Sequence, residues 1–147
     1  MKIKVKKLNE NAIIPQYQSI LASGFDFHAV EDLVIPKGET RLVKTGLSFE
    51  VPEGYEMQIR PRSGTSLKTK LRICNSPGTI DADYRGEVCI IMENTAKDEC
   101  NQIIEGKVCY SGDITIEKGD RIAQGVICPV IQVELIEESE LTNTSRG

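Results

Sequence analysis

The sequence lacks, or has few of, the residue types and long apolar runs that several classes of protein require. It has no tryptophan, a single histidine (His28), and no apolar run near the roughly 20 residues of a membrane span. One histidine cannot form a histidine-rich metal centre. The basic N-terminus, "MKIKVKKLNE", is followed by no apolar segment, so it does not fit a signal peptide. It predicts a first strand with Ile3 and Val5 on one face, and we expect no membrane partner.

The cysteine pattern argues against two further kinds of site. The five cysteines stand at positions 74, 89, 100, 109 and 128. An odd count without a CxxC pair argues against a disulfide framework and against a zinc site. We therefore expect reduced thiols in a cytoplasmic protein.

Acidic side chains outnumber basic ones, which gives a net charge of −4. A chain of this balance has no overall footprint for nucleic acid, so we expect no nucleic-acid partner. With 147 residues, 27% charged and 39% apolar, it suits one soluble globular domain over 1–147. The exception is the stretch 60–72, "RPRSGTSLKTKLR", which holds five basic side chains and no acid. It predicts a small polyanionic ligand, and a solvated edge is the alternative.

Glycine or proline interrupts the chain about every ten residues, and short β-rich runs lie between these interruptions. Examples are "TRLVKTGLSFEV", "GYEMQIRP", "EVCIIMEN" and "QVELIEE". This spacing predicts an all-β sandwich or barrel. The one helical candidate is a turn or two after Ser63, which can cap it. The polar stretch 94–112 is predicted to be a longer loop or an extra hairpin.

Two stretches carry groups suited to a phosphate or a metal-bound water. "PRSGTS" places Arg62, Ser63 and Gly64 at the predicted helix start, where backbone N–H groups suit a phosphate oxygen. An ordinary Ser-Gly turn is the alternative. "ASGFDFHA" buries Asp26 between aromatic residues, where a carboxylate needs a partner or a metal-bound water. A turn aspartate bonding its own backbone is the alternative there.

Two other stretches are denser in polar groups than a simple turn or strand requires. "NSPGTIDADYRG", residues 75–86, packs an asparagine, two aspartates, a tyrosine and an arginine into twelve positions. "KGDRIAQGVICPV" predicts a turn and then a strand. Simple alternation would put Arg121, Ala123 and Gly125 on one face and Ile122, Gln124 and Val126 on the other. Gln124 is then either a buried polar contact or an edge-strand residue.

Taken in this order, these stretches resemble the motifs of the homotrimeric dUTPases over residues 22–147. The motifs that carry the resemblance are "ASGFDFHA", "RPRSGTS", "NSPGTIDADYRGEV" and "KGDRIAQGVI". The resemblance implies a distorted jelly-roll-like β barrel of short strands with at most one short helix. It also implies a homotrimer with its sites at subunit interfaces. The implied reaction is hydrolysis of dUTP to dUMP and pyrophosphate by in-line attack of water on the α-phosphorus, with Mg²⁺ on the triphosphate. It would control the dUTP level and supply dUMP for thymidylate synthesis.

The third motif is implied to read the nucleoside and activate water. Asp81 corresponds to the carboxylate that deprotonates the attacking water and contacts the sugar 3′-OH. Tyr84 corresponds to the ring beneath the deoxyribose that leaves no room for a 2′-OH, and Asn75 to the group that bonds the uracil edge. Backbone groups at three further positions complete base recognition: Thr79, Ile80 and Cys89. Asp83 and Arg85 receive only structural or interface roles.

The other motifs are implied to hold the triphosphate. The phosphate-binding loop consists of Arg62, Ser63 and Gly64. Asp26 reaches Mg²⁺ through water, the metal being held mainly by the triphosphate. Gln124 helps to hold the phosphates or the water, and Arg146 reaches the γ-phosphate. Asp81, Asp26 and Gln124 are thus the implied catalytic set.

Two departures from the family pattern affect these expectations. Residues 141–147, which end in "SRG", resemble only the start of a glycine-rich tail, and the last aromatic residue is Tyr110. Because the aromatic that would cover the base is absent, the chain as given is expected to bind dUTP and Mg²⁺ but to hydrolyse dUTP slowly. The stretch 94–112 is also longer than in compact family members, and we expect it to form a surface hairpin.

Two other functions remain open from the sequence. The dCTP deaminases share the fold, but they need a glutamate base where Ile91 stands here; Glu93 lies two residues away on the same strand face. Their arginine after the Arg-Ser pair is also replaced, with Leu67 near its place. The second alternative is a non-catalytic nucleotide sensor or regulatory binder. Pyrophosphate release from dUTP, dCTP and UTP would separate the three.

Overall fold

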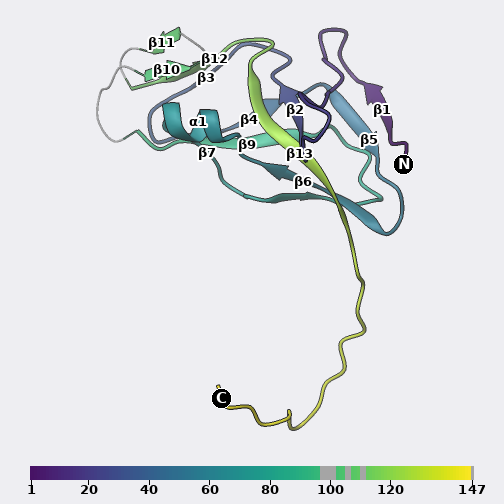
Figure 1. The fold of residues 1–147 in the computed structure, drawn as a ribbon. Coiled ribbons are helices and arrows are strands. Elements are labelled where there is room, and N and C mark those ends of the chain that lie inside the picture. The colour runs from purple at the N-terminus through teal and green to yellow at the C-terminus, as the bar shows by residue number, and fades with distance from the viewer. Residues whose placement is uncertain (97–101, 105–106, 110–111, 147) are drawn as a thin grey trace.

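The structure, a computed structural model, describes residues 1–96, 102–104, 107–109 and 112–146 (Figure 1). Within these residues the only helix is α1 (Ser63–Lys68), so the predicted all-β fold with one short helix is confirmed. The strands are β1 (Lys4–Lys7), β2 (Phe25–His28), β3 (Leu33–Ile35), β4 (Thr40–Lys44), β5 (Leu47–Glu50), β6 (Tyr55–Arg60), β7 (Leu71–Ile73), β8 (Gly78–Ile80), β9 (Cys89–Asn94), β10 (Gln102–Ile104), β11 (Lys107–Cys109), β12 (Ile114–Ile116) and β13 (Arg121–Pro129).

One four-stranded antiparallel sheet brings all the motif-bearing segments together. Its strand order is β2-β13-β6-β8, so segments from near the two ends of the sequence meet at the β2–β13 pair. β6 leads directly into α1, and β8 leads into the acidic turn that follows Ile80. The remaining sheets are β4-β9-β7, β1-β5, β3-β12 and β10-β11.

The core lies against the inner face of this sheet and follows strand alternation. Phe27, Met57, Ile59 and Ala123 are all buried there. Phe27 packs edge-on against Phe49, with ring centroids 5.6 Å apart. Ile3 and Val5 also pack on the core, as the first strand predicted.

The start of the helix differs from the prediction. The N-cap is Arg62, with extended backbone and no side-chain cap hydrogen bond, and Ser63 is the first helical residue. The proposed cap at Ser63 is therefore wrong. After β6 the backbone is still extended at Arg62, and the helix begins one residue earlier than a serine cap would require.

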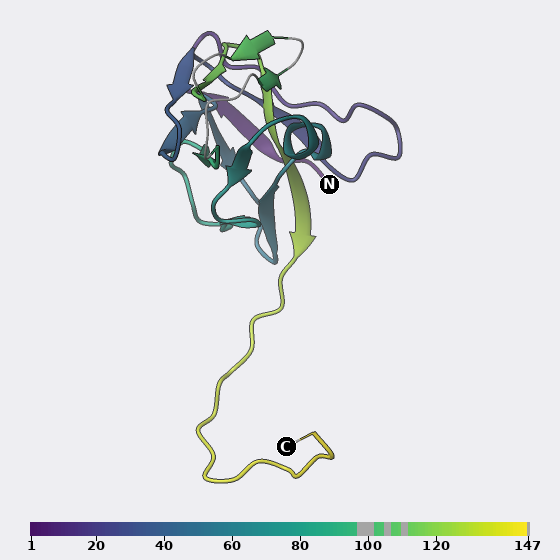
Figure 2. The same ribbon diagram turned by 90° about the vertical axis from the view of Figure 1, so that its left-hand side faces the viewer.

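The C-terminal arm, residues 130–146, runs away from the folded body (Figures 1 and 2). Its run "QVELIEE", predicted to be β-rich, is not a strand, since it pairs with no other strand of the described chain. Ile131 is 87% exposed and Leu135 is 90% exposed. Several exposed apolar side chains close together are typical of an interaction surface.

Three other sequence expectations concern the insertion, the cysteines and the membrane. Within 94–112, β10 and β11 pair as an antiparallel hairpin, while 97–101, 105–106 and 110–111 lie outside the described residues. Of the cysteines whose side chains are described, Cys74, Cys89 and Cys128 are free thiols. No helix in the described part of the chain has the length and apolar character needed to cross a membrane.

Candidate functional site

Asp26 is a buried carboxylate held between two arginines. Its side chain is 11% exposed and lies on β2, which pairs with β13. Arg62 Nε donates to Asp26 Oδ1 at 3.1 Å, and Arg121 Nη1 donates to Oδ2 at 3.4 Å. A buried charge needs such partners, and losing one of them leaves it uncompensated. Asp26 therefore fixes the guanidinium of Arg62, immediately before α1.

Gln124 occupies the position directly opposite Asp26 on β13. β13 is a central strand, so the edge-strand alternative does not apply. Its Nε2 donates to the carbonyl of Pro61 at 2.9 Å, which ties β13 to the connection between β6 and α1. A Cβ added at Gly24 would lie only 2.7 Å from Gln124 Oε1. The glycine of "ASGFDFHA" thus leaves room for this amide.

Arg121 joins this group although alternation along β13 assigned it to the opposite face. The register between β13 and β2 shifts between Arg121 and Ala123, so Arg121 pairs with His28 while Gln124 pairs with Asp26. Such a bulge re-aims a side chain. Arg62 Nη1 also donates to the carbonyl of Arg121 at 3.2 Å. The only feature of the sequence that pointed to this role for Arg121 was that the buried Asp26 required partners.

His28 borders the same group. Its Nδ1 atom is buried and has no hydrogen-bond partner within the described chain. Burial lowers the pKa of His28 from its ordinary value of 6.5; the nearby Asp26 raises the pKa, and Arg121 and Arg62 lower it further. The neutral imidazole is the form that the folded chain favours.

A pH dependence of stability follows from this lowered pKa. Since the unfolded chain binds the proton more readily, stability should fall as the pH drops from about 6.5 through the lower folded pKa, and stay unaffected above 6.5. His28→Gln should remove this part of the acid sensitivity. Urea unfolding at pH 7 and pH 5 measures it, and equal losses for parent and variant would contradict it.

The phosphate-binding candidates Ser63 and Gly64 form the first turn of α1. Ser63 is exposed, and a Cβ added at Gly64 would meet open space. The basic stretch 60–72 does not converge on this point as a whole. Arg60 donates to Gln58 Oε1 at 2.6 Å, and Arg72 donates to backbone carbonyls.

A second group follows β8. Asp81 is exposed, and its carbonyl accepts the backbone N–H of Tyr84 at 3.2 Å, which closes a turn. Asp81 and Asp83 line a cleft of about 630 Å³ together with Glu53, Tyr55 and Glu56. In the described chain, the lining of this cleft includes none of Asp26, Arg62 and Gln124.

Tyr84 is held over the turn that follows. Its Oη donates to the carbonyl of Glu87 at 2.9 Å, and Tyr84 is 42% exposed. Asn75 is exposed and lies close to Gly78, where an added Cβ would come within 3.0 Å of Asn75 Nδ2. A hydroxylated ring and an amide are thus both exposed within one short stretch of sequence.

The three backbone positions expected to read a base lie on the strands that flank this turn. Thr79 is exposed opposite Gln58, and the half-buried Ile80 lies opposite Met57 and packs on the core. Cys89 begins β9, and burial raises the pKa of its thiol, with Glu87 adding to the effect. The thiol is therefore favoured over the thiolate.

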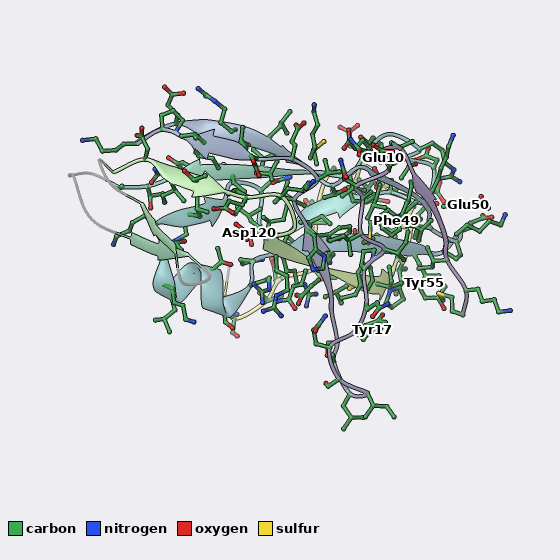
Figure 3. The ribbon with its side chains drawn as sticks, turned by 90° about the horizontal axis from the view of Figure 1, so that it is seen from above. Glu10, Tyr17, Phe49, Glu50, Tyr55 and Asp120 are labelled. Atoms are coloured by element: carbon green, nitrogen blue, oxygen red, sulfur yellow. The ribbon has the colours of Figure 1, made fainter. Side chains whose placement is uncertain are left out.

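The two groups lie at different ends of β13. Tyr55, which lines the cleft, is opposite Pro129, five residues beyond Gln124. At ~3.3 Å per residue, the cleft is roughly 16 Å along the strand from Gln124. Figure 3 shows the separation, with Asp120 next to the start of β13 and Tyr55 at its far end. Arg146 joins neither group, because it lies at the end of the arm (Figure 1).

Comparison with known proteins identifies close relatives. The family described as dUTPase matches residues 10–147. A protein of Nautilia profundicola named deoxyuridine 5'-triphosphate nucleotidohydrolase is 49% identical, over 100% of this chain and 94% of its own length. A protein of the same name from Helicobacter pylori is 43% identical, over 100% of this chain and 92% of its own length.

Solved structures of dUTPases share the fold. A mutant of the Staphylococcus bacteriophage 80alpha dUTPase, solved with dUpNHpp, has a TM-score of 0.87 and 34% identity, over 99% of this chain and 94% of its own. A mutant dUTPase from phage phi11 of S. aureus, described with a structural Mg(II) ion, has a TM-score of 0.84 and 31% identity, over 95% of this chain and 98% of its own. These similarities support the jelly-roll-like form predicted for the strands.

Proposed function

Since this chain belongs to the dUTPase family, we propose that it hydrolyses dUTP to dUMP and pyrophosphate by in-line attack of water on the α-phosphorus. The dUTP diphosphatase activity follows from family membership. The residue roles, the metal and the assembly are our proposal. The observation that carries them is the exposed Asp81 at the cleft, with Tyr84 fixed beside it by the Glu87 carbonyl.

Asp81 is the proposed general base. It is exposed, so water can reach it, and the turn to Tyr84 fixes its backbone. The Tyr84 ring would lie beneath the deoxyribose and exclude a 2′-OH. Asn75 would bond the uracil edge, and a base of the wrong kind would leave those groups unpaired. Backbone groups complete the base site at Thr79, Ile80 and Cys89.

Arg62, Ser63 and Gly64 would bind the triphosphate. The Asp26 pair orients the Arg62 guanidinium before a phosphate arrives, which lowers the cost of placing it. Gln124 would hold a phosphate oxygen or the attacking water from β13. Arg146 would reach the γ-phosphate only once the arm is docked.

The residues present fit a Mg²⁺ ion held mainly by the triphosphate. In the described chain, no group of three or more histidine, cysteine or acidic side chains forms a metal site. Asp26 accepts from two arginines, yet a carboxylate has about four acceptor positions, so it retains acceptor capacity for a metal-bound water. Bound Mg²⁺ would neutralise charge on the phosphates.

We also propose a homotrimer whose sites combine groups from different subunits. Two observations support it. The Asp81 cleft and the Asp26 group lie roughly 16 Å apart along one strand, farther than a near-attack geometry allows within one chain. The arm exposes Ile131 and Leu135, which another subunit could cover. The free thiols are compatible with a cytoplasmic location.

A substrate panel tests the function. With Mg²⁺, the chain should release pyrophosphate from dUTP much faster than from dCTP or UTP. The dCTP sample should yield no ammonia, since Ile91 stands where a deaminase needs its glutamate. Nucleotide binding without pyrophosphate release would favour a sensor, and ammonia from dCTP would favour a deaminase.

A further inference from the structure

Gly86 lies against the hydroxyl end of the Tyr84 ring. A Cβ added at Gly86 would come within 2.5 Å of Tyr84 Oη and 2.6 Å of Tyr84 Cζ. Real Cβ atoms do not approach other heavy atoms so closely, so one of the two groups would have to move. The three nearest atoms to that Cβ all belong to Tyr84.

The requirement for glycine here does not come from the backbone. Gly38 has a φ of +77°, where side chains are strained, whereas the φ of Gly86 lies outside that left-handed range. An alanine could therefore adopt the backbone of Gly86 without strain. The group that an added side chain would meet first is the tyrosine ring.

Two other crowded glycines differ in what a side chain would meet. At Gly24 the closest contact is the end of the flexible Gln124 side chain, which can rotate away. At Gly125 it is the packed rings of Phe25 and Phe27 in the core. Of these three glycines, only Gly86 faces a rigid ring at the surface, held by a hydrogen bond to the Glu87 carbonyl.

We propose that Gly86 is a positioning residue for sugar selection, acting through the Tyr84 ring. This inference rests on the proposed role of Tyr84 beneath the deoxyribose. A methyl group at position 86 would displace the Tyr84 ring and break its hydrogen bond to the Glu87 carbonyl. Because Tyr84 is already 42% exposed, its ring has solvent to move into. The displaced ring would no longer occupy the space of a 2′-OH.

A double-mutant cycle tests the proposal. Gly86→Ala should lower the ratio of kcat/KM for dUTP over UTP by at least about tenfold, as Tyr84→Ala should. In the Tyr84→Ala background, Gly86→Ala should change that ratio by less than about twofold, because the ring that it displaces is gone. Gly38→Ala is the matched control. Its positive φ strains the fold far from the turn, so it should lower the melting temperature and leave the ratio at the parental value.

A second measurement does not depend on turnover. In protein with ¹³C-labelled tyrosine rings, Gly86→Ala should move the Tyr84 ring resonances toward those of an exposed tyrosine, without any nucleotide. An unmoved Tyr84 signal, a parental dUTP/UTP ratio in Gly86→Ala, or a full additional loss of about tenfold on top of Tyr84→Ala would each overturn the proposal. A parent chain that does not hydrolyse dUTP would instead overturn the proposed function, and the ring signal would still decide whether Gly86 seats Tyr84.

Discussion

Replacing Asp81 with asparagine is expected to lower kcat by roughly 10²–10⁴-fold, the range for loss of a general base. Affinity for a non-hydrolysable dUTP analogue should stay within several-fold, because asparagine keeps the shape and one acceptor oxygen of the side chain. Asp81 is exposed at the turn, so the substitution removes no buried ion pair. Single-turnover hydrolysis and calorimetric binding would separate the two effects.

Asp83→Asn is the matched control for this prediction. Asp83 lies two residues away, is also exposed, and lines the same cleft. Removing its charge changes the field in the cleft much as removing that of Asp81 does, yet Asp83 has no proposed contact with the attacking water. Equal losses in the two variants would show that the charge of the cleft matters and that Asp81 is not the base.

Substituting Val133 and Leu135 together with aspartate is expected to abolish the trimer and reduce turnover by at least about 100-fold. Val133 and Leu135 are 71% and 90% exposed and stand two positions apart in the arm. Burial of each Val or Leu is worth ~1.5–3 kcal/mol, and a trimer would contain every such contact three times. Activity should fall with assembly because each site is proposed to span subunits.

Light scattering checks the assembly directly. The parent should have about three times the 16.3 kDa mass of one chain, and the double variant should approach the mass of a single chain. Glu134→Gln, between the two positions, should leave the mass and turnover unchanged. A trimeric double variant, or a parent that turns over dUTP as a monomer, would contradict the role assigned to the arm.

Local chemistry in the sequence determined much of this protein. The glycine and proline spacing predicted short strands, and β4, β5, β6 and β9 lie within the runs that it marked out. Asp26 between two phenylalanines required a partner wherever the chain folded, since a buried carboxylate is costly alone. The motif order also predicted the family. Each motif is a set of neighbouring residues, so it can be recognised without knowing its contacts in the folded chain.

The tertiary structure decided which residues face one another. Arg121 reaches Asp26 across 95 positions of sequence because of a register shift in the β13–β2 pair. Alternation along β13 alone put Arg121 on the wrong face. The run "QVELIEE" has the composition of a strand and is not one, because strand formation needs a partner and the described chain offers none. In both cases the deciding energy is long-range pairing, which a window of neighbouring residues does not contain.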